Sequence, residues 1–392
     1  MLTIGIPRET LPGELRVAQV PETVARLIAG GLAVQVEAGA GERAGHRDQA
    51  YAEAGATIVA DAAAAHAGAH IVLRVREPRL LASGHHEADL LEPGTVLVGF
   101  LNLHANPDLL DRLAARGVTA FAMERIPRTT RAQRMDALSS MSTIAGYKAA
   151  LLAANALGRI FPLLMTAAGT IAPARVFVLG AGVAGLQVIA TARRLGAVVE
   201  AFDVRPAARE EVQSLGATFV AAADLTDASH ADAGGYAKAL THEQEERERA
   251  LIHNHVAGSD VVVTTANIPG RKAPALITEA MVRDMKQGSV IVDLAAETGG
   301  NCELTRPGGE VMAHGVTILG PMNLAAAVPV HASQMYARNL LAFIQLMVKD
   351  GALNLNFGDD ILAATCATHG GRHGGAPAAT PPVSDAPEQV PA

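Results

Sequence analysis

A glycine-rich stretch near the middle of the chain has the residue types and spacing of a phosphate-binding turn. Residues 176–203 read VFVLGAGVAGLQVIATARRLGAVVEAFD, which predicts a strand, a glycine turn, a helix and a second strand ending in an acid. The first glycine allows a tight turn, the second lets the backbone approach a pyrophosphate, and the third lets the helix pack against the strand. The helix N-terminus then faces the phosphates. The predicted phosphate-binding residues are Gly180, Gly182, Val183, Ala184 and Gly185.

Asp203 ends the second strand of this unit. It follows the glycines by about 20 residues, the distance at which an acid accepts hydrogen bonds from the adenosine ribose hydroxyls. A carboxylate at this point favours NAD over NADP. Val204 and Arg205 follow it and are included in the predicted contact. Arg205 leaves attraction of a 2'-phosphate open, although the neighbouring carboxylate would repel one. Purely structural roles for the glycines and the aspartate are the alternative.

Two further polar loops follow predicted strands farther along the chain, TTANIPG at residues 264–270 and DLAAETGGN at residues 293–301. Ligands of open α/β sheets bind at the carboxyl edge of the strands. We therefore expect Thr265, Ala266 and Asn267 to line the nicotinamide half of the site. As isolated motifs, the two loops are equally compatible with ordinary glycine and asparagine turns.

A polar stretch, RTTRAQRMDALSS at residues 128–140, concentrates three arginines, a glutamine and an aspartate in a largely aliphatic chain. No residue of the sequence is an evident proton donor for a dehydrogenase, a role usually filled by His or Lys. The 14 histidines are dispersed, and His253 and His255, two apart on a predicted helix, point to different faces and do not form a metal site. GxSxG, HExxH and paired-cysteine patterns are absent from the sequence.

The elements that must position these residues form an α/β fold. Apolar runs on successive residues are typical of strands covered on both faces, and here they alternate with helical segments. We therefore predict two Rossmann-like, doubly wound parallel-sheet domains joined by two long helices. The predicted strands are LTIGIP, LAVQVEAGA, HIVLRV, TVLVGFLN, VTAFAME, VFVLG, VVEAFD, DVVVTTA, SVIVDLA and VTILG.

The two long helices, SSMSTIAGYKAALLAANALG and PVHASQMYARNLLAFIQLMVKDG, carry the chain into a second domain and back. We predict a discontinuous first domain at residues 1–135 plus 325–369, and an NAD(H)-binding domain at residues 136–324. Residues 370–392, rich in Pro, Ala and Gly, cannot build a core and predict a disordered tail.

Composition excludes several classes of protein. The 392 residues are 49% hydrophobic with a formal net charge of -7, so large cores are expected and a basic surface for nucleic acid is not. The first residues do not resemble a signal peptide, and the longest apolar stretch, AALLAANALG, is too short to span a bilayer. Cys302 and Cys366 have no CxxC spacing and are expected to be unpaired thiols. A cytoplasmic protein without direct membrane insertion is expected.

Several motifs resemble a known pair of families. IGIPRET, ELRVAQVPE, VEAGAGERAG and VLRVREP are similar to the N-terminal domain shared by alanine dehydrogenase and proton-translocating nicotinamide nucleotide transhydrogenase. Alanine dehydrogenases carry a catalytic lysine and a histidine in stretches that correspond here to RVREP and FLNL, where Arg76 and Asn102 stand. Arginine stays protonated and asparagine does not titrate, so the resemblance favours the transhydrogenase.

PRTTRAQRMDALSS resembles the Arg-Gln-Asp loop of the NAD(H)-binding component of transhydrogenase, and GAGVAGLQ, FDVRP, GGYAK, VTTANIPG and GGNCE follow in the family's order. The resemblance implies that Gln133 lies nearest the second nucleotide, while Arg128 and Asp136 orient the loop and ring. It also implies that Ser139 bonds the carboxamide and that Tyr236 belongs to a lid. The alternatives are an Arg/Asp pair that anchors a linker and a surface tyrosine in a loop.

The resemblance implies direct hydride transfer from NADH, bound here, to NADP⁺ held on a partner subunit, with protons passed by membrane-spanning subunits. A homodimer associated peripherally with the inner (cell) membrane through those partners is expected. Such transfer needs positioning and exclusion of water rather than an acid or base. The rivals are a self-contained, alanine-dehydrogenase-like oxidoreductase and a protein that senses NAD(H) without turnover.

Overall fold

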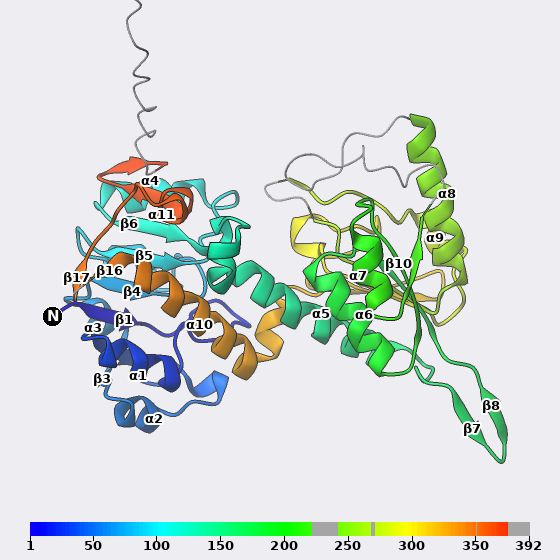
Figure 1. Ribbon diagram of the computed structural model, residues 1–392, viewed down its shortest axis with the longest axis horizontal. Coiled ribbons are helices and arrows are strands. Elements are labelled where there is room, and N and C mark those ends of the chain that lie inside the picture. The colour runs from blue at the N-terminus through cyan, green and yellow to red at the C-terminus, as the bar shows by residue number, and fades with distance from the viewer. Residues whose placement is uncertain (222–241, 268–270, 350, 375–392) are drawn as a thin grey trace, which may run out of the picture. The chain divides into compact units, whose positions relative to one another are not determined.

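The computed structural model describes residues 1–221, 242–267, 271–349 and 351–374 (Figure 1). The chain divides into two compact units. The first comprises Met1–Leu138 together with the chain from Pro329 onward, and the second comprises Ser139–Val328. The long helix α5 (Ala137–Ala156) begins at the end of the first unit and continues into the second.

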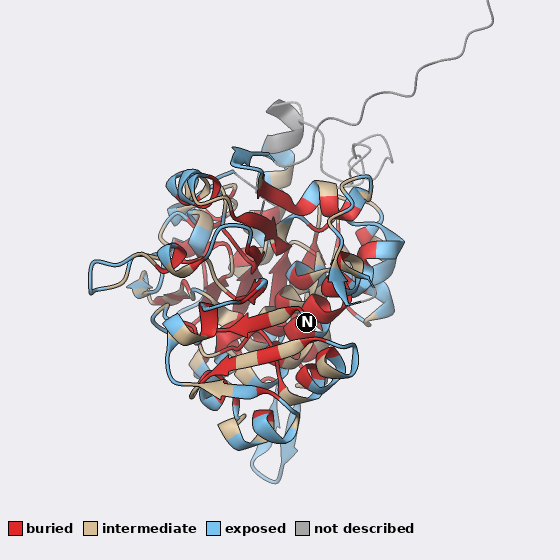
Figure 2. Cartoon of the chain, turned by 90° about the vertical axis from the view of Figure 1, so that its left-hand side faces the viewer, coloured by how far each residue is buried: buried red, intermediate tan, exposed pale blue. Residues whose placement is uncertain are grey.

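The first unit is built on an eight-stranded sheet in the order β19-β18-β6-β5-β4-β1-β2-β3. Its strands are β1 (Thr3–Ile6), β2 (Ala33–Glu37), β3 (Thr57–Val59), β4 (Ile71–Leu73), β5 (Val96–Gly99), β6 (Thr119–Ala122), β18 (Cys366–His369) and β19 (Arg372–His373). The first six pair in parallel, whereas β18 and β19 are antiparallel. Figure 2, which faces this unit, shows buried strands between partly exposed helices. The helices are α1 (Pro21–Ala29), α2 (Asp48–Glu53), α3 (Ala62–His66), α4 (Pro107–Ala115), α10 (Pro329–Met347) and α11 (Asp360–Thr365).

The second unit has a seven-stranded sheet in the order β11-β10-β9-β12-β13-β15-β14, parallel except for the edge strand β14. Its strands are β9 (Arg175–Leu179), β10 (Val198–Phe202), β11 (Thr218–Val220), β12 (Val261–Thr264), β13 (Val290–Asp293), β14 (Glu310–Ala313) and β15 (Val316–Leu319). The strand order reverses between the adjacent strands β9 and β12, which is the doubly wound topology. The helices are α6 (Val183–Arg194), α7 (Ala208–Ser214), α8 (His242–Gly258) and α9 (Glu279–Arg283).

Both faces of the second sheet are covered, as its continuous apolar strands predict. One core contains alanines of α5 together with Val188 and Ile189 of α6, and the other contains Ile252 of α8 and Met281 of α9. Gly146 of α5 lies so close to α6 that a Cβ atom there would be 2.2 Å from the Ala184 carbonyl oxygen. The close approach explains a glycine in the middle of this helix.

All ten predicted strands are present, and the predicted fold class is confirmed. The hairpin of β7 (Leu164–Thr166) and β8 (Gly169–Ile171) was not predicted, because its strands are three residues long and exposed. The predicted start of the tail at residue 370 is wrong. Gly370 and Gly371, with φ of 57° and 74°, turn the chain from β18 into β19, so this glycine pair forms a hairpin turn.

None of the described helices has the length and hydropathy required to cross a membrane. The predicted second long helix ends at Met347, and residues Val348–Lys349 and Ala352–Leu353 then form the short antiparallel pair β16 and β17. Cys302 and Cys366 are both buried free thiols, as predicted.

Candidate nucleotide-binding site

The glycine turn joins β9 to α6 and has room for a ligand at one of its three glycines. At Gly180, φ is 96° and a Cβ atom would lie 2.7 Å from Thr265 Oγ1. At Gly185, a Cβ atom would lie 1.9 Å from the Gly180 carbonyl oxygen, so no larger residue fits between helix and strand. Gly182 has an ordinary φ of -74° and open space where a Cβ atom would stand. Backbone shape requires the first and third glycines, whereas only an approaching ligand would require the second.

The loop after β12 lies beside this turn, at the point where the strand order reverses. The Thr265 backbone nitrogen donates to the Leu179 carbonyl oxygen at 2.8 Å, and its hydroxyl donates to the Gly180 carbonyl oxygen at 2.9 Å. Asn267 accepts a hydrogen bond from the Thr298 hydroxyl through Oδ1 at 3.2 Å. Thr265, Ala266 and Asn267 therefore lie at the carboxyl edge where doubly wound sheets bind ligands.

Asp203 organises the second turn of the site. Its side chain is only 7% exposed. Oδ2 accepts from the Ala181 backbone nitrogen at 2.7 Å, and Oδ1 accepts from the Arg205 backbone nitrogen at 2.8 Å. The guanidinium of Arg205 adds two bonds to the same carboxylate, which raise the pKa of Arg205. Arg205 is thus engaged by Asp203 rather than presented alone to a 2'-phosphate.

A buried carboxylate, Asp293 at the end of β13, ties the neighbouring loops together. It has no exposed surface and accepts five hydrogen bonds. The donors are the hydroxyls of Thr264 and Thr305 and the backbone nitrogens of Ala295, Asn301 and Cys302, at 2.7 to 3.0 Å. The sequence placed Asp293 at the start of a loop but held no sign of this network, because its donors are dispersed from residue 264 to residue 305.

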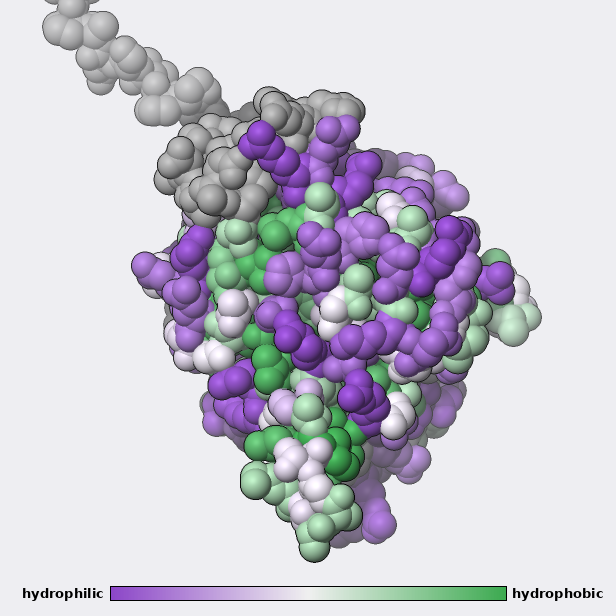
Figure 3. Space-filling model, turned by 90° about the vertical axis from the view of Figure 1, so that its right-hand side faces the viewer, coloured by the Kyte–Doolittle hydropathy of each residue, from purple (hydrophilic) through white to green (hydrophobic). Residues whose placement is uncertain are grey.

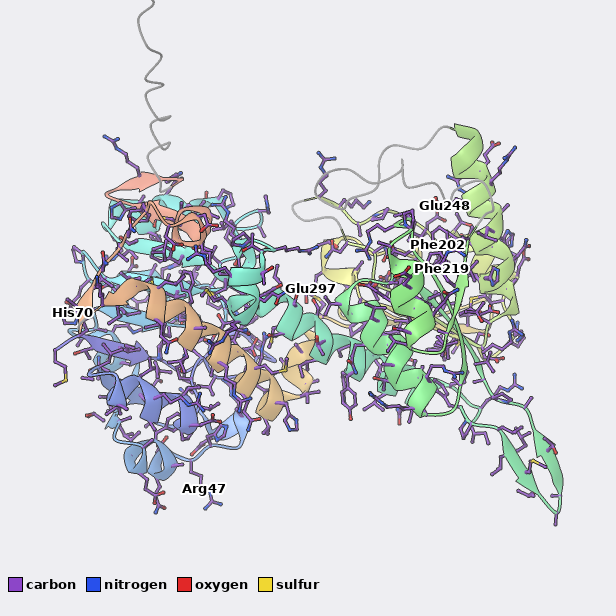
Figure 4. The ribbon with its side chains drawn as sticks, in the orientation of Figure 1. Arg47, His70, Phe202, Phe219, Glu248 and Glu297 are labelled. Carbon is purple, nitrogen blue, oxygen red and sulfur yellow. The ribbon has the colours of Figure 1, made fainter. Side chains whose placement is uncertain are left out.

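Asn301 extends the same network to the loop after β12. Its Nδ2 donates to the carbonyl oxygens of Ala266 and Pro274, each at 2.8 Å, and the residue is fully buried. Figure 4 labels Phe202, the residue before Asp203, and Glu297, which accepts from the Asn323 backbone nitrogen. The loops at this edge of the sheet are therefore held by side chains on several strands.

The polar stretch at residues 128–140 begins in the first unit. Residues Thr130–Met135 form a short 3₁₀ helix whose Ala132 and Met135 are buried, and Gln133 and Arg128 are exposed. Within the described residues of the chain, neither the Gln133 amide nor the Arg128 guanidinium has a hydrogen-bond partner. Asp136 is half-buried, and Ser139 lies in the first turn of α5, which begins two residues before it at Ala137.

The positions that distinguish the two resembling families lie in the first unit. Arg76 is 19% exposed, and its Nε lies 3.4 Å from Oε2 of Glu77. It lines a pocket of about 340 Å³ together with Glu77, Arg79 and His86. Asn102 has a left-handed backbone conformation with φ of 49°. Neither residue can transfer a proton near neutral pH.

Tyr236 lies outside the described residues, so its predicted role stays a prediction. In the described ranges, no group of three or more His, Cys, Asp or Glu side chains could hold a metal ion. His253 and His255 contact different partners, since the first lies 2.8 Å from Asp284 and the second 2.9 Å from Glu200.

The fold and the glycine turn define a dinucleotide-binding protein built from two doubly wound units. The chain matches the family models for the alanine dehydrogenase/PNT N-terminal domain at residues 5–145 and the alanine dehydrogenase/PNT C-terminal domain at residues 149–374. It belongs to the alanine dehydrogenase/PNT family.

Two relatives within the family are transhydrogenases. The chain is 46% identical over 372 residues to the first of the separately named pieces of NAD(P) transhydrogenase subunit alpha from Rhodospirillum rubrum, a match that covers 94% of this chain and 97% of that protein. The crystal structure of transhydrogenase from Sinorhizobium meliloti superposes with a TM-score of 0.86 at 45% identity, covering 95% of this chain and 99% of that one. The alanine dehydrogenase of Bacillus subtilis (strain 168) is more distant, at 33% identity over 84% of this chain and 81% of that protein.

Proposed function

We propose that this chain is the NAD(H)-binding subunit of a proton-translocating transhydrogenase, in which hydride passes directly from NADH to NADP⁺ held on a partner subunit. The observation that carries the proposal is the 128–136 loop, which is packed at Ala132 and Met135 but presents Gln133 and Arg128 to solvent. Similarity to a transhydrogenase alpha subunit along almost the whole chain supports it.

The second unit supplies the binding of NAD(H). The open space beside Gly182 and the N-terminus of α6 suit a pyrophosphate, since backbone N–H groups there can donate to it. Asp203 is placed to accept from a ribose hydroxyl once part of its bonding to Arg205 is exchanged. Val183, Ala184, Val204 and the loop from Thr265 to Asn267 complete the proposed contacts.

The first unit supplies positioning at the reacting ring. The reduced nicotinamide supplies the hydride when bound. Gln133, with both an amide donor and an acceptor, would contact the second nucleotide, while Arg128 and Asp136 would orient the loop and the ring. Ser139 would hydrogen-bond the carboxamide. Fixed orientation of two reactants can contribute several kcal/mol to a barrier, about 7–11 kcal/mol in the best intramolecular cases.

Direct hydride transfer between two nicotinamides also explains what the chain lacks. A dehydrogenase that acts on an amine or alcohol moves a proton as the hydride moves. Arg76 and Asn102 occupy the positions of the lysine and the histidine that would do so by resemblance. A chain that retains a dinucleotide site without a proton donor suits a reaction without proton transfer in its chemical step.

The partners follow from the same proposal. NADP⁺ would be held on a different subunit, and proton passage would be carried by membrane-spanning subunits, because the described helices of this chain cannot span a membrane. The chain would act as a homodimer at the cytoplasmic face of the inner (cell) membrane, attached through those partners.

The test is an assay of the purified chain alone and then mixed with the membrane-spanning and NADP-binding subunits of a transhydrogenase. We expect oxidation of NADH by an NADP⁺ analogue only in the mixture. Oxidation of NADH by pyruvate and ammonium with the chain alone would favour the dehydrogenase instead. NADH binding without turnover in either assay would favour a sensor.

A further inference from the structure

Arg131 joins the 128–136 loop to the start of α11, near the end of the described chain. Its Nη1 donates to Asp359 Oδ2 at 2.7 Å, and its Nη2 donates to Asp359 Oδ1 at 2.9 Å. Nη2 also contacts the carboxylate of Asp360. A guanidinium that meets a carboxylate through two parallel bonds is fixed in direction as well as in distance.

The receiving end of this contact is itself held in place. Asp359 Oδ1 accepts from the backbone nitrogens of Ile361 and Leu362, at 2.9 and 3.3 Å, and so caps α11. The hydrogen bonds from Arg131 lower the pKa of Asp359, which keeps this carboxylate charged. Both Ile361 and Leu362 are buried, and the chain then enters β18 beside β6. Arg131 is therefore attached to the core of the first unit.

A second anchor lies on the other side of Gln133. Asn339 of α10 donates through Nδ2 to the Arg134 carbonyl oxygen at 2.9 Å. Ala132, between Arg131 and Gln133, has no exposed surface. Gln133 thus stands between two anchored neighbours, and its own side chain points into solvent.

We propose that Arg131 is a positioning residue for hydride transfer, which acts on Gln133 by fixing the loop to Asp359 and Asp360. The inference rests on the proposed function of this loop. The Arg131 side chain is 48% exposed, and half-exposed ion pairs contribute little to folding. A small displacement of a positioned group, in contrast, can reduce a rate about a hundredfold. The effect of Arg131 therefore falls on the transfer rate rather than on stability.

The test compares Arg131→Gln, the pair Asp359→Asn with Asp360→Asn, and all three substitutions together, in the full-length chain mixed with its partner subunits. Asparagine can still cap α11 at residue 359, so the pair removes charge while the helix stays capped. We expect each of the first two variants to lower the single-turnover transfer rate about ten- to a hundredfold, with the melting temperature unchanged and the NADH dissociation constant changed less than about twofold. We expect the combined variant to be no slower than either. Arg134→Gln, which removes an equal charge from the same loop, should keep the wild-type rate.

A second measurement does not depend on the activity. Trypsin cleavage after Arg134, followed by mass spectrometry, should be faster in the Asp359→Asn, Asp360→Asn chain than in the wild type, because the loop is released. A wild-type transfer rate in Arg131→Gln, an additive loss in the combined variant, or an equal loss in Arg134→Gln would each overturn the proposal. If the wild-type mixture transfers no hydride, the proposed function fails, and unchanged cleavage would then overturn the anchoring role separately.

Discussion

The guanidinium of Arg205 meets the carboxylate of Asp203 through two hydrogen bonds, from Nε to Oδ1 and from Nη2 to Oδ2, each 2.9 Å long. The backbone nitrogens of Ala181 and Arg205 occupy two further acceptor sites of the same carboxylate. A carboxylate has about four such sites, so its capacity is filled. A ribose hydroxyl that bonds Asp203 must therefore replace one of these donors, and the Arg205 side chain is the one that can move away.

Asp203→Asn should reverse part of the preference for NADH over NADPH. The variant loses a charged acceptor for the ribose and leaves Arg205 without its counter-ion, so a 2'-phosphate is attracted. We expect NADH affinity to fall about tenfold, the loss of one charge-assisted hydrogen bond, and NADPH affinity to rise. Fluorescence titration with each nucleotide measures both. Asp284→Asn, a surface carboxylate in the same unit, is the matched control, and equal changes in both variants would contradict a specific role for Asp203.

Gly182→Ala and Gly185→Ala should separate binding from folding. The first places a methyl group in open space, so we expect an unchanged melting temperature and weaker NADH binding. The second places it 1.9 Å from the Gly180 carbonyl oxygen, so we expect a loss of about 1–3 kcal/mol in the free energy of unfolding. Urea denaturation and NADH titration of both variants make the comparison. Normal NADH binding by Gly182→Ala would show that the pyrophosphate lies elsewhere.

Asp293→Ala should be strongly destabilising, because it leaves buried donors without an acceptor. Five hydrogen bonds end on this carboxylate, so we expect a loss of about 3 kcal/mol or more in the free energy of unfolding. Thr305→Val removes a single donor and should cost about 1 kcal/mol. Chemical denaturation measures both. If Asp293→Ala instead kept its stability and lost only NADH binding, the carboxylate would be a nucleotide contact.

His66 should make folding stability fall in mild acid. Burial lowers the pKa of this histidine in the folded chain, opposed by the contact of Nδ1 with the Ala62 carbonyl oxygen at 2.6 Å. The unfolded chain then binds the proton more readily, so the contribution of His66 is complete above about pH 6.5 and is lost as the pH falls toward its folded-state pKa. His66→Gln should show a smaller loss between about pH 7.5 and about pH 5.5 than the wild type. Equal slopes in the two proteins would show that His66 does not contribute.

The hairpin of β7 and β8 offers a test of the proposed homodimer. Leu164 and Ile171 form a cross-strand pair, and both are more than 40% exposed, as are Leu163 and Met165 beside them. Figure 3, which faces the second unit, shows hydrophobic surface gathered at its lower end. If a second copy covers this hairpin, Leu164→Asp should weaken dimerisation about tenfold or more, the value of one buried leucine. Met312→Asp, at an exposed apolar residue on β14, is the control for sedimentation analysis. A dimer that is unaffected by Leu164→Asp would exclude the hairpin as its interface.

The sequence was sufficient for the parallel sheets and the glycine turn, because both depend on local patterns. Continuous apolar runs such as VVVT and VIVD are buried on both faces, and the spacing of Gly180, Gly182 and Gly185 is enough to indicate a strand, a turn and a helix. The hairpin of β7 and β8 was missed because short exposed strands leave no apolar periodicity.

The contacts that hold the site could not be predicted in the same way. Arg131 and Asp359 are 228 residues apart, and the charges of the RTTRAQR stretch do not indicate which carboxylate they meet. The donors to Asp293 come from two loops and from the end of β12, so the role of this residue depends on tertiary folding. Side chains that position a loop were thus invisible where side chains that bind a ligand had a motif.

The most direct measurement follows a deuterium label from NADH deuterated at the transferring C4 position to an NADP⁺ analogue, in a mixture of this chain and its partner subunits. Direct transfer predicts that the reduced analogue carries the label and that, in D₂O with unlabelled NADH, it gains none from solvent. Incorporation of solvent deuterium into the product, or transfer of the label to pyruvate by the chain alone, would contradict the account.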